Sequence, residues 1–407
     1  MKSDYQRQSE RCRRILRETV VDFFLPDCLD NVNGGYLEDR EDGVFVPSPE
    51  KFVLLQARQA WVFSLIADQD IEKSACLEAA QTGLDYLEKY MRDPKHGGYY
   101  ATVSDSGEPA DTRKHVCLNV FVLYALARNY MVTEDPSVLA KAQDLFALLE
   151  RHAYDQTGGG YVEFFTEDWT PILDRNAHNY FSTTGTKTLN THLHIVETYA
   201  ELYRVWPDPV LKARIEELVE MVFNKFRHPL YSRNINAWTP DWKYVLKRHN
   251  FRANYGHDME SVWFAMDACE STGVSFEPYF PRAKAIFNYC LKRGYDRRHG
   301  GFYSQGPLAG IGQVRDKVWW VQAESLVAML MMFKKTADHV YYQTFEDTLD
   351  FIERHQITAD GGWLEILHAN GTPKVRRCAS RWQGGYHTAR SMILSSNMLD
   401  ELASGAS

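Results

Sequence analysis

Pairs of polar side chains recur near the start of several nearly apolar helical segments. Four segments carry two such residues three or four positions apart: Asn190 with His194, His257 with Glu260, Trp320 with Glu324, and His387 with Arg390. Residues at this spacing share one face of a helix. Two further segments carry Arg58 and Cys117 at the corresponding place. Buried polar groups are costly unless they are paired, so a convergent set is better explained by a ligand site than by packing.

Two histidines that face one carbon from opposite sides suit epimerisation. One imidazole removes the proton next to the carbonyl of an open-chain sugar, and the other returns a proton to the opposite face of the same carbon. Histidine titrates near neutral pH and can act as base and then as acid. The intermediate is an enediolate, whose charge needs donors such as Arg58 or His194. This chemistry needs no cofactor.

Other chemistries use some of the same residues. A glycosidase needs two opposed carboxylates, and Glu260 with Glu324 could supply them. A metal could bind His192, His194, His257 and Glu260, which are suitable ligand types. His192 and His194, however, are two positions apart and point to different helix faces, and the chain has no HExxH motif. A lone histidine on an apolar helix is more often a hydrogen-bonded core residue. We therefore expect no metal. We also expect no phosphate-binding loop, because the sequence has neither GxxxxGK(S/T) nor GxGxxG.

Glycine turns mark a repeat. NGGY, HGGYY, TGGGY, HGGFY and DGGW place paired glycines from positions 34, 97, 158, 300 and 361, so the gaps are 63, 61, 142 and 61 residues. The long gap fits two periods with a marker missing near 228–234. Apolar residues between the markers follow helical spacing. Six helix pairs predict an all-α (α/α)6 barrel with short β-hairpins at one rim, as one catalytic domain over 1–407. An open solenoid is the rival architecture.

Composition limits the partners and the compartment. Acids and bases are mixed along the 407 residues with a net charge of −8, which disfavours nucleic acid. No apolar stretch reaches the roughly 20 residues of a membrane span, and no secretory signal is visible at the N-terminus. Seven scattered cysteines without CxxC fit a reducing cytoplasm. We expect a cytoplasmic monomer or homodimer whose partner is a small sugar.

The quoted segments are similar to a known family. LLQARQAW around Arg58, DTRKH at 111–115, LNTHLHIVETYAELY at 189–203, YGHDMES at 255–261, KVWWVQAES at 317–325 and RWQGGYHTAR at 381–390 resemble the N-acylglucosamine 2-epimerase superfamily, most closely its cellobiose 2-epimerase branch. The resemblance implies an (α/α)6 barrel with His257 and His387 as proton-transfer bases.

The same resemblance implies roles for the remaining residues. Asn190, His194 and Arg58 would bind the reacting sugar and help to open its ring. Glu260 and Glu324 would orient the substrate or the histidines, and Trp320 and Trp382 would stack on sugar.

Two departures from the family pattern affect the predicted substrate. Cys117 stands near a position where the family has a sugar-contacting tyrosine, and Gln383–Gly385 replace another run before His387. A thiol is a weak hydrogen-bond donor. We therefore predict interconversion of D-mannose and D-glucose. The alternatives are a disaccharide with glucose or mannose at its reducing end, aldose–ketose isomerisation of the mannose–fructose type, and glycoside hydrolysis.

Overall fold

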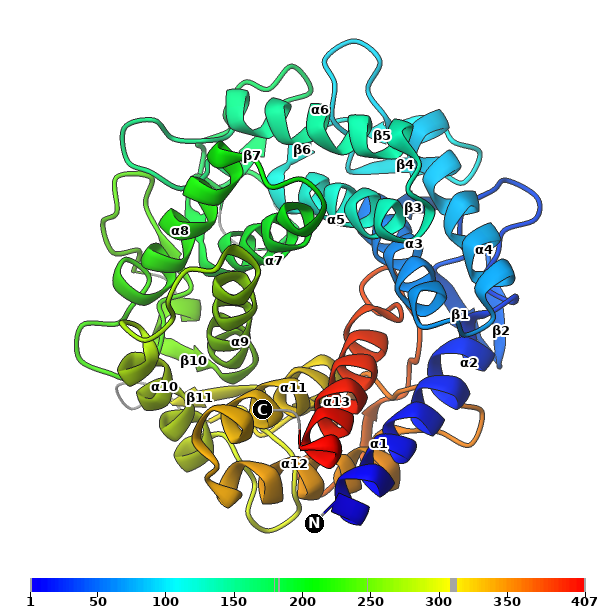
Figure 1. Cartoon of the computed structure of the whole chain (residues 1–407). Coiled ribbons are helices and arrows are strands. Elements are labelled where there is room, and N and C mark those ends of the chain that lie inside the picture. Colours follow the sequence, from blue (N-terminus) through cyan, green and yellow to red (C-terminus); the bar gives the residue numbers. More distant parts are fainter. Residues whose placement is uncertain (1, 179, 182–183, 247, 308–312, 406–407) are drawn as a thin grey trace.

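The apolar segments of the repeat fold into six helices around a central axis. The computed structural model describes residues 2–178, 180–181, 184–246, 248–307 and 313–405. The inner helices are α3 (Val53–Asp68), α5 (Val116–Thr133), α7 (Leu189–Val205), α9 (Tyr255–Thr272), α11 (Trp319–Thr336) and α13 (Tyr386–Ser404). Each packs on the next, and α13 packs on α3, so the ring is closed (Figure 1). The closed ring confirms the (α/α)6 barrel and excludes the open solenoid.

Amphipathic helices cover the outside of the ring. They are α1 (Lys2–Leu16) with α2 (Asp22–Phe24), α4 (Lys73–Tyr86), α6 (Pro136–His152), α8 (Pro209–Asn224), α10 (Phe280–Arg293) and α12 (His339–Phe351). Short π-helical turns at Arg17–Val21, Leu87–Met91 and Ile352–Gln356 extend three of the outer segments. Asp135 and Asp208 cap α6 and α8 with their side chains, and proline follows each cap, which is a common way to begin a helix. The N-terminal α1 packs on the C-terminal α13 and completes the sixth pair (Figure 1).

Short antiparallel strands close the helix pairs at the rim where the inner helices begin. The strands are β1 (Asp39–Glu41), β2 (Val44–Val46), β3 (Glu50–Phe52), β4 (Thr102–Ser104), β5 (Pro109–Asp111), β6 (Lys114–His115), β7 (Phe164–Phe165), β8 (Lys187–Thr188), β9 (Ala237–Trp238), β10 (Arg252–Asn254), β11 (Gln305–Pro307), β12 (Lys317–Val318), β13 (Ile366–Leu367) and β14 (Pro373–Val375). In five units, the strand before an inner helix pairs with the strand after its outer helix, as in β8 with β9. The first residues of the inner helices are thereby fixed at this rim.

The predicted turn markers correspond to six equivalent turns. An isolated β-bridge spans each: Leu29–Tyr36, Arg92–Tyr99, Tyr154–Tyr161, Arg227–Asn234, Tyr295–Phe302 and Ile357–Trp363. The fourth turn lies where the sequence predicted a missing marker. The expectation of short strand pairing at one rim is confirmed.

A buried lysine paired with an aspartate holds four of these turns. We call these pairs the turn locks: Lys51–Asp30 at 2.5 Å, Lys114–Asp93 at 2.8 Å, Lys187–Asp155 at 2.7 Å and Lys317–Asp296 at 2.9 Å. In each, the aspartate also accepts backbone N–H groups of its own turn, as Asp93 does from Lys95 and His96. The lysine lies just before an inner helix, so the lock ties the turn to the start of that helix.

Side chains of the inner helices α3, α5, α7 and α11 reach four of these turns. Tyr36, Tyr99 and Phe302 donate their backbone N–H groups to Gln56, Asn119 and Gln322. In the third unit, Tyr161 donates to Nε2 of His192 at 3.1 Å. Gly160 has φ +68°, and a Cβ there would lie 2.7 Å from that nitrogen, so glycine is required. His192 is thus a structural residue of the repeat.

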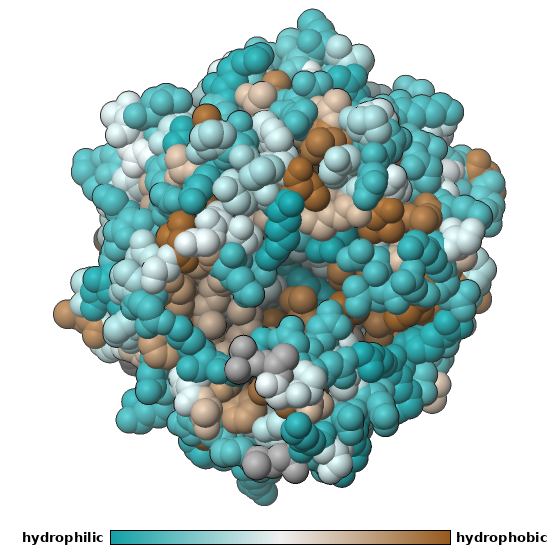
Figure 2. Space-filling view, viewed as in Figure 1, coloured by the Kyte–Doolittle hydropathy of each residue, from teal (hydrophilic) through white to brown (hydrophobic). Residues whose placement is uncertain are grey.

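Helix α5 is, by length and composition, the one candidate membrane span within the described ranges. Of its 18-residue window, 72% is buried inside the ring, as expected of a core helix. The face shown in Figure 2 is largely hydrophilic and is hollowed near the middle of the ring.

Candidate active site

A cavity of about 310 Å³ opens at the rim where the inner helices begin. Its walls are Arg58, Tyr180, Phe181, Asn190, His194, His257, Glu260, Trp319, Trp320, Trp382 and His387. The structure thus brings eight of the ten predicted site residues together around one space. Cys117 and Glu324 do not line it.

Cys117 lies behind the cavity wall. Its side chain is fully buried, and its sulfur accepts a long contact of 3.9 Å from Nδ2 of Asn190. We expected Cys117 to bind the substrate at the place of a sugar-contacting tyrosine. The structure corrects this expectation, because Cys117 does not line the cavity. The hydrogen-bond contact of its thiol is with Asn190, which does line the cavity.

Glu324 also lies behind the wall, where it holds His387. Its Oε1 is 2.6 Å from Nδ1 of His387 and 2.6 Å from Nη2 of Arg390, while its Oε2 accepts from Nε1 of Trp263 at 3.1 Å. A carboxylate at Nδ1 favours the tautomer that carries the proton there, which leaves the Nε2 lone pair for the cavity. Burial, followed by the charges of Arg58 and Arg390, holds the pKa of His387 well below its ordinary value. His387 is therefore neutral at ordinary pH and can accept a proton at Nε2.

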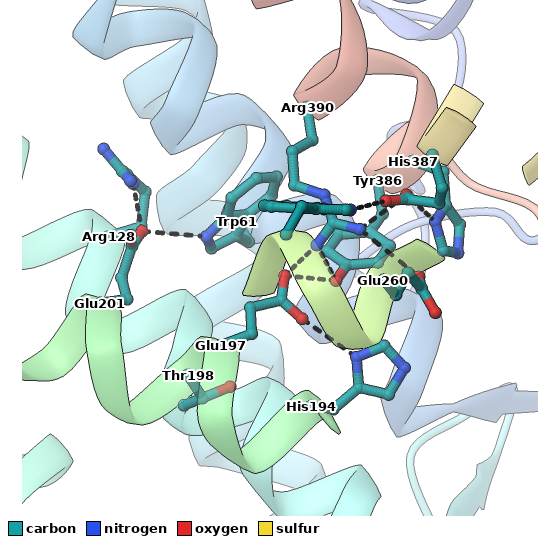
Figure 3. Close-up of polar contacts among 12 residues, drawn as sticks. Trp61, Arg128, His194, Glu197, Thr198, Glu201, Glu260, Tyr386, His387 and Arg390 are labelled. Carbon is teal, nitrogen blue, oxygen red and sulfur yellow. Dashed lines mark hydrogen bonds and ion pairs between the residues drawn. The ribbon is translucent and has the colours of Figure 1, made fainter. Parts of the chain in front are cut away.

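His194 has a carboxylate of its own, which the sequence interpretation missed. Glu197 places Oε2 3.0 Å from Nδ1 of His194, and its Oε1 accepts from Arg390 and from Oη of Tyr386 (Figure 3). Burial alone would raise the pKa of Glu197, but Arg390, His194 and Tyr386 lower it to about 2. The signal available in the sequence was spacing, because Glu197 follows His194 by three residues on α7.

His257 differs from the other two histidines. Among the described residues no carboxylate pairs with its ring, which packs against Trp320 at 5.2 Å between centroids. Asn254 caps α9 by accepting the backbone N–H of His257 and thereby fixes where the side chain begins. Burial lowers the pKa of His257 to about 3, with a smaller effect from His194. His257 is also neutral at ordinary pH and can accept a proton.

Arg58 provides the free positive charge of the site. Its guanidinium is sandwiched between Phe121 at 4.1 Å and Tyr386 at 4.5 Å, and its Nε has no hydrogen-bond partner within the described part of the chain. Burial lowers the pKa of Arg58, yet arginine stays protonated in proteins. No carboxylate of the described residues pairs with this buried guanidinium, which is therefore suited to an oxygen that becomes negative during a reaction.

Glu260 is the complementary unsatisfied group. Its Oε1 is buried without a hydrogen-bond partner in the described ranges, and Arg390 lies 3.8 Å away. Burial and the neighbouring Glu324 raise the pKa of Glu260 well above its ordinary value. Burial also raises the pKa of Glu324, but Arg390, which is 2.6 Å from Glu324, counteracts this rise, so Glu260 is the carboxyl of the pair that keeps a proton more readily. Glu260 is then a neutral acid that can donate a hydrogen bond to a sugar oxygen.

Glu260, Glu324 and His387 form the one group of possible metal ligands found within the described ranges, with ligand atoms within 4.8 Å of one another. The guanidinium of Arg390 already supplies a cation to Glu324. The other metal set considered from the sequence does not form, because His192 is used by the turn described above. The donor set therefore fits an ion-pair network better than a metal centre.

Aromatic rings form the outer wall. Trp382 packs on Phe52 at 5.0 Å and on Phe181 at 5.5 Å, and Trp320 lies between His257 and His387, 5.7 Å from the latter. Such faces suit the C–H surfaces of a sugar ring. A second cavity of about 210 Å³ adjoins the first and shares Phe181, Asn190 and His257 with it. Its other walls are polar and include Arg252, Asn254 and Gln305.

Comparison with known proteins decides the family to which this site belongs. Residues 34–391 match the N-acylglucosamine 2-epimerase (GlcNAc 2-epimerase) family. The chain belongs to this family. It is 29% identical to a cellobiose 2-epimerase of Bacteroides fragilis over 94% of this chain and 97% of that protein.

Further relatives agree in fold and in chemical class. The structure of cellobiose 2-epimerase from Bacillus thermoamylovorans superposes with a TM-score of 0.87, at 28% identity, over 96% of this chain and 98% of that one. A D-mannose isomerase of Marinomonas mediterranea is 24% identical over 91% of this chain and 93% of that protein. The protein is a carbohydrate epimerase or isomerase, and the resemblance noted in the sequence is confirmed.

Proposed function

We propose that the enzyme interconverts D-mannose and D-glucose by moving a proton at C2, with His257 and His387 as the two bases. The observation that carries the proposal is that both imidazoles are neutral, line the same cavity and flank Trp320. One accepts the C2 proton as the C–H electron pair becomes the C1–C2 double bond of an enediolate. The opposite histidine takes up a proton from water and donates it to the other face of C2, while the first histidine releases to water the proton that it accepted.

Three groups are placed to stabilise the enediolate. Arg58 offers a cation without a carboxylate partner, Glu260 offers a protonated carboxyl, and Asn190 offers an amide on the same wall. Preorganised donors of this kind, aimed at developing negative charge, commonly supply the largest share of catalysis. His194 is a third neutral imidazole on this wall, and it can act as the base that accepts the hydroxyl proton when the sugar ring opens. No step requires a nucleotide or a redox cofactor.

A disaccharide substrate is the second candidate, supported by the adjoining polar cavity. The reducing-end sugar of a disaccharide would occupy the histidine cavity, and its second ring would extend past Asn190 and Phe181 into the adjoining cavity.

Isomerisation to a ketose would use the same enediolate but return the proton to C1. Hydrolysis is less well supported, because a glycosidase needs two carboxyl groups that face the scissile bond. Only Glu260 of the two lines the cavity, while Glu324 lies behind the wall and is engaged by His387 and Arg390.

Proton NMR in heavy water tests these reactions together. The enzyme is incubated separately with mannose, glucose, fructose and cellobiose. We expect mannose and glucose to interconvert with deuterium entering at C2. Faster conversion of cellobiose than of either monosaccharide would favour the disaccharide, and fructose formation would favour isomerisation. Release of glucose from cellobiose would show hydrolysis and contradict the proposal.

The ring closure by α1 and α13 supports one catalytic domain over residues 1–407. The seven cysteines are all free, and six are buried, which supports our proposal of a reducing compartment such as the cytoplasm. We further propose a monomer or homodimer, which light scattering would test.

A further inference from the structure

Five buried side chains form a continuous chain behind the cavity wall. Nδ1 of His194 meets Glu197 at 3.0 Å, Arg390 contacts Glu197 and lies 2.6 Å from Glu324, and Glu324 meets Nδ1 of His387 at 2.6 Å. They come from three inner helices, α7, α11 and α13, which surround the central axis (Figure 1). None is more than 7% exposed. One guanidinium therefore serves two carboxylates, each of which holds one histidine.

The hydrogen bonds define the proton positions on both rings. Glu197 uses Oε1 for Arg390 and Tyr386 and keeps Oε2 for His194. Because an ionised carboxylate only accepts hydrogen bonds, the imidazole nitrogen that faces it carries the proton. Nε2 of His194 is then left with its lone pair, and His194 lines the cavity. The arrangement repeats at His387 with Glu324.

We propose that Glu197 is a positioning residue that fixes the tautomer of His194, and that Arg390 links it to Glu324 so that both histidines present an Nε2 lone pair to the substrate. The catalytic consequence rests on the proposed function. Glu197 does not line the cavity and acts through the residues that it contacts, His194, Arg390 and Tyr386. Without the carboxylate of Glu197, either ring nitrogen of His194 can carry the proton. A glutamine at this position would not restore the selection, because a neutral amide can both donate and accept a hydrogen bond.

The same helix provides a matched control. Glu201 lies one turn along α7, is also buried, and accepts from Nε1 of Trp61 at 3.3 Å and Nε of Arg128 at 2.5 Å. Figure 3 shows it directed away from the histidines, with Arg128 and Trp61. Glu197→Gln and Glu201→Gln therefore remove the same charge from one buried helix face, but only the first touches a cavity histidine.

Steady-state kinetics on the full chain form the first test. We expect Glu197→Gln to lower kcat by at least about 100-fold, the scale on which a misoriented base acts, with KM changed less than about threefold. Glu201→Gln should lower Tm and leave kcat within about threefold of the wild type. If Glu197→Gln folds and keeps kcat within that range, Glu197 is structural only and the proposal fails.

Nitrogen-15 NMR of the histidine rings in the free wild-type protein tests the tautomer without any turnover. The His194 resonances are assigned by their absence in His194→Gln. We expect the Nδ1–H tautomer in the wild type and in Tyr386→Phe, which keeps the charge of Glu197. An Nε2–H tautomer in the wild type overturns the proposal even if Glu197→Gln does not fold. If no tested sugar is epimerised, the proposed function fails, while the NMR still decides the tautomer.

Discussion

The turn locks and the catalytic cluster are both built from buried charges, but they are organised differently. Each lock pairs one lysine with one aspartate, and the same pairing occurs in four units. The cluster instead combines two arginines, three glutamates and three histidines, each present at one place in the ring: Arg58, Arg390, Glu197, Glu260, Glu324, His194, His257 and His387. It leaves Nε of Arg58 and Oε1 of Glu260 without partners in the described ranges. The paired charges of the turn locks stabilise the barrel, whereas the unpaired polar atoms of the cluster are suited to bind a ligand.

The largest expected effect is on stability, at a lock. Lys114→Ala leaves Asp93, whose side chain is fully buried, without its cation. We expect a loss of about 3 kcal/mol in the free energy of unfolding, measured by denaturant titration. Activity per folded molecule should be nearly unchanged. The control is Lys73→Ala, which removes an exposed partner of Asp70 and should have no measurable effect. Equal effects of the two variants would contradict the role of the locks.

Substitution of the histidines should lower activity more than stability. His257→Ala or His387→Ala should lower turnover by at least about 100-fold, the usual scale of a general acid or base. Denaturant titration should show a smaller loss of stability than at the lock. A folded variant of either histidine with a near-wild-type rate would refute the two-base mechanism.

The pH profile separates the neutral bases from ordinary histidines. Burial lowers the pKa of His257 to about 3 and that of His387 well below its usual value, so both stay able to accept a proton as the pH falls through 6.5. Below its pKa each would be protonated and inactive, so the acid limb of kcat/KM lies below about pH 5. Burial and Glu324 raise the pKa of Glu260, and its ionisation gives the alkaline limb.

This profile is measured as kcat/KM between about pH 4 and about pH 9, over which each limb should fall about tenfold per pH unit. Glu260→Gln cannot ionise and should remove the alkaline limb. An acid limb centred near the ordinary histidine pKa of about 6.5 would show that the bases are not shifted as the structure indicates.

A smaller effect is expected at Cys117. Cys117→Ala removes the weak acceptor of Asn190, a change worth about 1 kcal/mol or less. We therefore expect kcat/KM to change by no more than about fivefold, and in the same direction for mannose and cellobiose. A large change confined to cellobiose would place this thiol in disaccharide selection after all.

The smallest expected effect is that of a chelator. Arg390, rather than a metal, supplies the cation next to Glu324. Activity should therefore survive exhaustive treatment with EDTA. Loss of activity that one divalent metal restores would assign the Glu260, Glu324 and His387 cluster to Lewis-acid chemistry instead.

The sequence by itself determined the barrel and most of the cavity wall. The spacing of the glycine turns and the apolar helices between them define a repeat that cannot bury its apolar faces until the ring closes. Polar residues at the start of successive inner helices must then meet at one rim. Side chains three or four apart share a face, which is why His194 and His257 were correctly placed at the cavity. His192, two residues from His194, points elsewhere for the same reason.

Only the tertiary structure decided which residues lie behind the wall. Cys117 and Glu324 occupy early helix positions like the others, yet they do not line the cavity, while Tyr180 and Phe181 reach the cavity from a loop with no periodic signal. Arg390 joins Glu197 and Glu324, which are 193 and 66 residues away along the chain. Local spacing cannot encode such contacts, because they depend on the rotation and approach of separate helices. The partners that fix the histidine tautomers are therefore set by packing around the closed ring.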